Sequence, residues 1–128
     1  MIASVASTRL RGWLPAIAVG VAILAASVVR VPDEPTPNTG LVGRTDLFHI
    51  AGYAALALVV AVTLSENREL PRSIHVGAVA VATLFGVGIE LVQAPIPWRS
   101  FAVADAVSNA VGAVVGAAVL GCWRRWRR

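Results

Sequence analysis

The chain has 128 residues and a formal net charge of +4, with 57% hydrophobic and 14% charged residues. Soluble proteins are typically about 45–50% apolar and about 25% charged. A soluble core of this length cannot hide so much apolar surface, so we predict an integral membrane protein with one domain, residues 1–128. All eleven basic residues are arginines at the ends of apolar segments, which favours anchoring at the membrane interface, and we expect no nucleic acid as a partner. A single cysteine excludes an internal disulfide.

The first predicted membrane span covers about residues 12–31. No charge interrupts the sequence between Arg11 and Arg30, close to the roughly 20 residues that cross a bilayer core. The alternative is a signal peptide cleaved near residues 25–27, with Arg9 and Arg11 as its basic start. The apolar run is long for such a peptide, and we expect the span to be retained.

Three further spans follow, separated by segments that break helices or carry charge. Residues 31–40 hold three prolines, a glycine and two acids, and form a loop outside the hydrocarbon. Prolines at positions 95 and 97 cannot continue a helix, so this segment belongs at an interface. The predicted spans cover about residues 47–65, 73–93 and 103–123. The fold class is therefore an all-α bundle of four transmembrane helices.

The arginines predict how this bundle is oriented. Four spans put both termini on one side of the membrane, and eight of the eleven arginines lie on that side. The positive-inside rule then places both termini in the cytoplasm of a multi-pass cell-membrane protein. The C-terminal run from Arg124 to Arg128 adds attraction to anionic membrane lipids, roughly 1 kcal/mol per basic residue near the surface.

Six polar residues occupy one layer of the predicted bundle. Counting about 1.5 Å of rise per residue along each helix places all of them within about 10 Å of the outer boundary. They are His49, Tyr53, Glu90, Gln93, Asp105 and Asn109. Asp46 lies on the helix face of His49 and Tyr53. We expect a polar pocket that opens to the outside.

Below this layer, small residues predict close helix packing. Asp105 and Asn109 share one stripe of the last span with Gly112 and Gly116, whose four-residue spacing lets a neighbouring helix approach. Gly86 lies on the face of Glu90 and would serve the same purpose. The glycine seam would suit contacts between chains as well as within one, so it leaves an oligomer open.

Each polar residue also has a purely structural interpretation. Asn109 would join helices, Tyr53 would be an interfacial aromatic, and His49 would be a packing histidine. Glu90 and Asp105 are harder to dismiss, because a bare carboxylate in lipid costs several kcal/mol and needs a partner. Arg99 is the natural partner, which makes a structural ion-pair network the alternative to a functional pocket.

The ordered pattern resembles the VanZ-like family of small prokaryotic membrane proteins. It consists of His49-x-x-x-Tyr53, Glu90-x-x-Gln93, Pro97-x-Arg99 and Asp105-x-x-x-Asn109-x-x-Gly112-x-x-x-Gly116, over about residues 44–120. One position departs from the family, which usually has an Asp-Lys pair with the acid four residues before the histidine. Here Asp46 is three residues before it and no lysine follows.

The resemblance implies a protein that acts near the cell envelope. The founding member of the family is associated with low-level resistance to teicoplanin, which targets lipid-linked wall precursors. We expect the pocket to bind a lipid-linked or anionic envelope component, with Arg99 meeting phosphate and Gln93 and Asn109 supplying hydrogen bonds. A link to teicoplanin resistance follows from the same resemblance.

Two alternatives come from other functional classes. In an intramembrane hydrolase or phosphotransferase, His49, Glu90 and Asp105 would hold a divalent metal, or His49 would act as a base oriented by Glu90. One histidine with two carboxylates is a poor zinc set, and we expect no metal or other cofactor. A proton-coupled transporter with Glu90 as relay ranks last, because its acids lie near one surface rather than at the midplane.

Overall fold

The computed structural model describes residues 2–29, 44–65, 72–99 and 102–127, and these form four α-helices without a strand. The helices are α1 (Ile2–Val28), α2 (Arg44–Ser65), α3 (Arg72–Gln93) and α4 (Val103–Trp126). Each is long and apolar enough to cross a membrane, so the predicted four-helix membrane fold is confirmed. The proline-rich loop expected at residues 31–40 lies outside the described residues.

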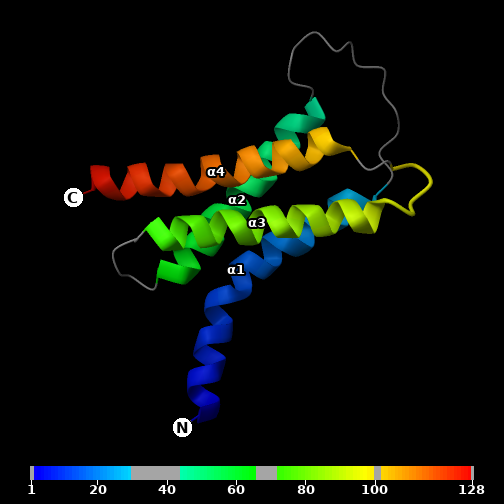
Figure 1. Ribbon diagram of the computed structural model, residues 1–128. Coiled ribbons are helices and arrows are strands. Elements are labelled where there is room, and N and C mark those ends of the chain that lie inside the picture. The colour runs from blue at the N-terminus through cyan, green and yellow to red at the C-terminus, as the bar shows by residue number, and fades with distance from the viewer. Residues whose placement is uncertain (1, 30–43, 66–71, 100–101, 128) are drawn as a thin grey trace.

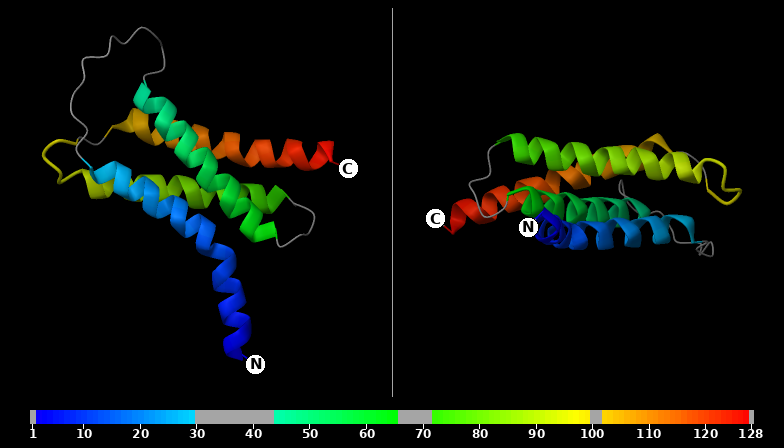
Figure 2. Two further views of the ribbon diagram at one scale, coloured as in Figure 1. Left: turned by 180° about the vertical axis from the view of Figure 1, so that it is seen from behind. Right: turned by 90° about the horizontal axis from the view of Figure 1, so that it is seen from below.

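Consecutive helices run in opposite directions along the bundle (Figure 1). The end of α1, the start of α2, the end of α3 and the start of α4 therefore lie at the same end of the molecule, which we call the pocket end (Figures 1 and 2). α3 ends at Gln93, and the chain then turns through Pro95 and Pro97, with the Ile96 amide donating to the Gln93 carbonyl at 2.9 Å. This is the helix break expected from the two prolines.

α2 and α4 pack closely through residues without side-chain bulk. A Cβ atom added at Gly112 would overlap the backbone of Ile50, and one at Gly116 would overlap the carbonyl of Ala54. Ala57 and Ala113 are completely buried in the same core. In a membrane, small residues of this kind allow helices to gain van der Waals contact at short range, which drives their association.

The outer surface of the bundle carries the large apolar side chains. Leu84 on α3 is 70% exposed and Val103 on α4 is 68% exposed. A soluble protein rarely exposes contiguous apolar surface on this scale, whereas lipid solvates it without cost. The arrangement of small residues inside and large ones outside is that of a multi-pass membrane protein.

α1 packs on the rest of the bundle mainly through α2 and makes few contacts with α3. Its N-terminal part leaves the bundle at an angle (Figure 1). Pro15 lies inside the helix, where a proline removes a backbone donor and is a common cause of bending. Thr63 of α2 donates a hydrogen bond of 3.1 Å to the carbonyl of Gly12.

The opposite end of the bundle is basic and aromatic. Arg124 donates a hydrogen bond of 2.8 Å to the hydroxyl of Ser65, which joins the end of α4 to the end of α2. The guanidinium of Arg127 lies 4.4 Å from the ring centre of Trp123. A cation on an indole face suits a membrane interface, in keeping with the anchoring role expected for this segment.

Candidate functional site

The six polar residues of the predicted layer all come from the helix segments at the pocket end. α2 begins there, and two turns of it carry His49 and Tyr53. Glu90 and Gln93 are buried in the last turn of α3, while Asp105 and Asn109 follow each other at the start of α4. Residues up to 60 positions apart in sequence therefore meet at one end of the bundle.

His49 is held mainly by α4. Its Nδ1 lies 2.7 Å from Oδ1 of Asn109, and its Nε2 lies 4.0 Å from Oδ2 of Asp105. Because an amide oxygen can only accept, this arrangement puts the Nδ1 hydrogen between the histidine and Asn109. The His49 ring is parallel to that of Tyr53, with centroids 6.4 Å apart. The sequence suggested Glu90 as the group that orients His49, and the structure places Asn109 and Asp105 beside it instead.

Three buried polar atoms of the site have no hydrogen-bond partner in the described part of the chain. They are the Tyr53 hydroxyl, Oε1 of Glu90 and Nδ2 of Asn109. Tyr53 is 2% exposed, Asn109 1% and Glu90 0%. The other carboxylate oxygen of Glu90 accepts from the amide of Ala102 at 3.5 Å. An unpaired buried polar atom costs on the order of 1–3 kcal/mol, so three in one place set this site apart from a packed core.

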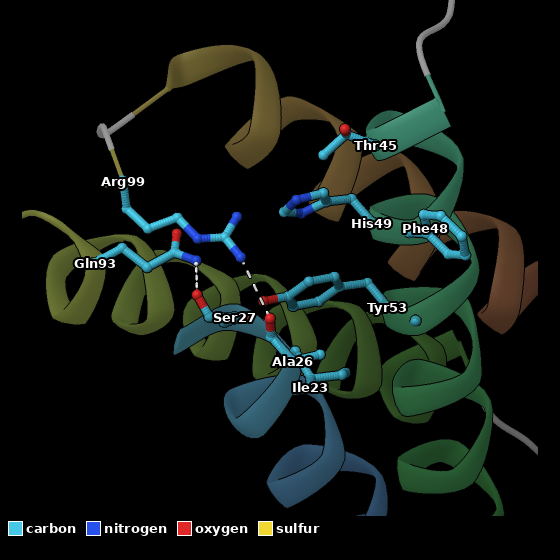
Figure 3. A pocket seen from close by; sticks show the side chains of 10 residues that line it. Ile23, Ala26, Ser27, Thr45, Phe48, His49, Tyr53, Gln93 and Arg99 are labelled. Atoms are coloured by element: carbon cyan, nitrogen blue, oxygen red, sulfur yellow. Dashed lines mark hydrogen bonds between the residues drawn. The ribbon is translucent and has the colours of Figure 1, made fainter. Parts of the chain in front are cut away.

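A pocket of about 320 Å³ lies in front of these groups and is bordered by α1, α2, α3 and the segment after α3. Figure 3 shows Arg99 and Gln93 on one side of it, with His49 and Tyr53 facing them from α2. Its polar lining comes from Ser27, Thr45, His49, Tyr53, Gln93 and Arg99. The pocket thus gathers one guanidinium, one imidazole, one phenol and one amide around a space large enough for a small head group.

Arg99 and Gln93 hold the C-terminal end of α1. Gln93 donates a hydrogen bond of 2.9 Å to the carbonyl of Ser27, and Arg99 donates one of 3.4 Å to the carbonyl of Ala26 (Figure 3). Arg99 also donates to the carbonyl of Val29 at 3.1 Å. The last carbonyls of a helix have no partner within it, and a cation there also interacts favourably with the helix dipole. In the described structure Arg99 forms no ion pair with Glu90 or Asp105, the partners expected from sequence.

α1 is the contributor that the sequence did not indicate. Its part in the site comes from the backbone carbonyls of Ala26, Ser27 and Val29, together with the side chain of Ile23 in the pocket lining. Every residue has a backbone carbonyl, so the amino-acid sequence does not indicate which carbonyls take part in a site. The only signal was the position of α1, whose predicted end lay at the same boundary as the polar layer.

The remaining predicted residues lie around the pocket rather than in its lining. Asp46, in the first turn of α2, accepts a hydrogen bond of 3.3 Å from the hydroxyl of Ser108. Gly86 lies behind the site, where an added Cβ would be 3.0 Å from Nδ2 of Asn109 and from the Tyr53 ring. A side chain at Gly86 would therefore press directly on two of the buried polar residues.

Metal ligation receives no support from the arrangement of side chains. Within the described residues, no three His, Cys, Asp or Glu side chains come together in a way that could hold an ion. His49 approaches Asp105, but Glu90 does not complete a set with them. The second histidine, His75, lies near Gly121 at the opposite end of the bundle.

Comparison with known proteins adds one match. The family model VanZ/LLP1 matches residues 6–124, which confirms the resemblance and extends it over the first span. The ordered polar residues had suggested a match over residues 44–120 only. No curated protein and no solved structure matches the chain.

Proposed function

The chain belongs to the VanZ/LLP1 family, and on that premise we propose that it binds an anionic or lipid-linked component of the cell envelope in its polar pocket. Four apolar helices make it a multi-pass membrane protein, and we place it in the cell membrane. The observation that carries the proposal is the position of Arg99. Its guanidinium borders a pocket of about 320 Å³ that also contains His49 and Tyr53 (Figure 3).

The hydrogen bonds of Arg99 leave it able to attract an anion. Both come from Nη2 and end on backbone carbonyls, and among the described residues Arg99 forms no ion pair with a carboxylate. The end of a helix offsets only about half an elementary charge. Nη1 and Nε make no hydrogen bond within the described residues, so each can donate to a phosphate or carboxylate oxygen.

The other pocket residues would complete a head-group site. The Tyr53 hydroxyl is buried, borders the pocket and has no partner in the described structure, so it can donate to a ligand oxygen. Neither carboxylate lines the pocket: Asp105 of α4 faces Nε2 of His49, and Glu90 of α3 accepts from Ala102. The pocket lining therefore offers a head group several donors and no carboxylate.

A lipid-binding assay tests this function. Purified protein would be titrated with phosphatidylglycerol and with phosphatidylcholine, and the bound lipid measured by native mass spectrometry. We expect preference for the anionic lipid, and a loss of about tenfold or more in Arg99→Ala, since a hydrogen bond to a charged group contributes about 1.5–3 kcal/mol. Arg125→Ala, an exposed arginine at the other end, is the matched control. Equal binding of both lipids by all three proteins would refute the proposal.

The proposal requires the pocket end to face outward, as the arginine distribution predicts. Two exposed positions at opposite ends test this in a Cys122→Ser background, which lacks other thiols. We expect Trp98→Cys to react with a membrane-impermeant maleimide in intact cells, and Arg127→Cys to react only after permeabilisation. The reverse pattern would place the pocket on the cytoplasmic side.

We also propose that binding in this pocket contributes to glycopeptide resistance of the cell. A protein that binds lipid-linked wall precursors would alter the access of teicoplanin to its target. Overexpression should then raise the inhibitory concentration of teicoplanin, and Arg99→Ala at equal expression should not. An identical shift for both proteins would separate any resistance from the pocket.

The hydrolase alternative rests on one feature, the orientation of His49 by Asn109 at the edge of the pocket. A fixed imidazole is suited to proton transfer. The geometry supplies less of the remaining machinery, since Ser108 points to Asp46 and no three acidic or histidine ligands gather among the described residues. Phosphate release from a lipid phosphate that is lost in His49→Gln, while lipid binding persists, would favour this alternative.

A further inference from the structure

An apolar groove lies along α1 where this helix meets α2 and α3. Its volume is about 330 Å³, similar to that of the polar pocket, and its lining is almost wholly hydrocarbon. The lining includes Ile17 and Leu24 of α1, Leu56 and Val60 of α2, and Val81 and Phe85 of α3. All six lie inside the candidate membrane spans, so the groove faces the bilayer interior.

The groove continues the polar pocket toward the middle of the membrane. On α1 the pocket uses Ile23, Ala26 and Ser27 and the groove extends from Leu24 down to Trp13, so the two ranges overlap at Ile23 and Leu24. On α2 the pocket uses Tyr53 and the groove begins at Leu56, one turn deeper. The rings of Tyr53 and Phe85 have centroids 6.5 Å apart and form the border between the two spaces. The same three helices thus present polar groups at their outer end and hydrocarbon directly below.

We propose that pocket and groove bind a single amphiphile, with its anionic head group at Arg99 and one of its hydrocarbon chains in the groove between α1, α2 and α3. This inference rests on the proposed function and adds that the protein also recognises a hydrocarbon chain of the ligand. A lipid in the outer leaflet has its head at the interface and its chains along the bilayer normal. Pocket and groove follow that order, and between Leu24 and Ile17 the groove follows α1 for about 10 Å.

The groove and the head-group site contribute differently to binding. Lipid tails are as apolar as leucine, so a chain that enters the groove from the bilayer gains packing contacts and no hydrophobic transfer energy. The charged contacts at Arg99 therefore supply affinity, and the groove selects the chain by shape. Changes in the groove should alter binding a few fold, and only for ligands whose chain reaches it.

Two valines of nearly equal exposure provide a matched pair of variants. Val81 lines the groove and is 45% exposed, whereas Val115 of α4 is 43% exposed and lies outside the groove lining. Val81→Trp should fill the groove and weaken binding of long-chain phosphatidylglycerol by about threefold or more, while Val115→Trp should not. Neither variant should change binding of dihexanoyl phosphatidylglycerol, whose chains are too short to occupy the groove. Equal loss for both lipids, or equal effects of both variants, would overturn the inference.

Photolabelling of the unmodified protein gives an independent readout. Phosphatidylglycerol with a photoreactive group in mid-chain should label peptides of α1 and α3 that border the groove, and phosphatidylcholine with the same chain should label them much less. Equal labelling by both would identify ordinary surrounding lipid and refute the inference. If Arg99→Ala leaves head-group preference and labelling unchanged, the proposed function itself fails. If Arg99→Ala abolishes that preference while labelling never reaches the groove, only the placement of the hydrocarbon chain in the groove fails.

Discussion

α4 and α1 both pack against α2, and they do so by different physical means. At the α4 side, glycines bring backbone onto backbone, with Gly112 against Ile50 and Gly116 against Ala54. At the α1 side, Gly52 of α2 meets only the Ile23 side chain, across ordinary van der Waals distance, and Gly20 of α1 faces the Phe85 ring of α3 at a similar distance. The first contact leaves no space, and the second leaves both cavities described above.

This difference gives the helices different structural roles. We call α2 and α4 the scaffold, because they position the polar side chains, and α1 the wall, because it borders the pocket. α2 and α4 hold His49, Asn109 and Asp105 in fixed relation, because their shared backbone contact allows one register. α1 instead closes the polar pocket through carbonyl groups held by Gln93 and Arg99. Polar hydrogen bonds at a helix end can exchange partners, whereas interlocked backbones cannot. The site therefore combines polar groups on two helices in backbone contact with a border that is held by hydrogen bonds.

The largest expected effect comes from the α2–α4 contact. Gly116→Ala places a methyl group on the backbone of Ala54, which cannot yield as a side chain can. We expect a loss of at least about 1–3 kcal/mol in the free energy of unfolding, measured by SDS titration in mixed micelles. Gly88→Ala is the control, because nothing lies within 4 Å of a Cβ atom at that position. Equal stability of the two variants would show that the backbone contact is not what joins the helices.

A smaller effect is expected where the scaffold orients the polar site. Asn109→Ala removes the acceptor of the His49 Nδ1 hydrogen bond and should cost about 1 kcal/mol in unfolding free energy. Ser108→Ala, on the neighbouring residue, removes a longer and more exposed hydrogen bond to Asp46 and should cost less. The same SDS titration compares them. A larger loss in Ser108→Ala would mean that Asp46, rather than Asn109, fixes the start of α2 against α4.

The smallest effect on global stability should come from the α1 border. Gln93→Leu removes the hydrogen bond to Ser27 but leaves the apolar packing of α1. We expect hydrogen–deuterium exchange in the last turn of α1 to speed up about threefold to fivefold, with exchange in α4 unchanged. Faster exchange in both helices would contradict the distinction between wall and scaffold.

The sequence predicted the parts of this molecule that depend on composition and helix rise. Four apolar runs set the spans, and a constant rise per residue brought His49, Glu90 and Asp105 to one depth. The spacing of Gly112 and Gly116 predicted a close helix contact on the last span, but it did not indicate that α2 is the partner helix. Depth and face can be counted along one helix, whereas the choice of neighbour depends on packing among all four.

The hydrogen-bond partners of Arg99 could not be predicted by counting residues along a helix. Its charge suggested a carboxylate partner, and two acids lay within the same layer. The structure gives it the carbonyls of Ala26 and Val29, because the end of α1 lies beside the turn that follows α3. Backbone acceptors are present at every residue, so only the arrangement of helices reveals which of them an arginine meets. That arrangement leaves the guanidinium without a carboxylate ion pair among the described residues.

The most direct test of the central claim is the distance between the Arg99 guanidinium and the phosphorus of a bound lipid. Solid-state NMR can measure ¹³C–³¹P dephasing in protein labelled at the arginine Cζ and reconstituted with phosphatidylglycerol. All eleven arginines carry the label, so arginines at the membrane interface contribute a background. We predict that short-range dephasing falls in Arg99→Ala and falls much less in Arg125→Ala. An identical signal in Arg99→Ala would contradict the account, because the phosphate would then be held by arginines outside the pocket.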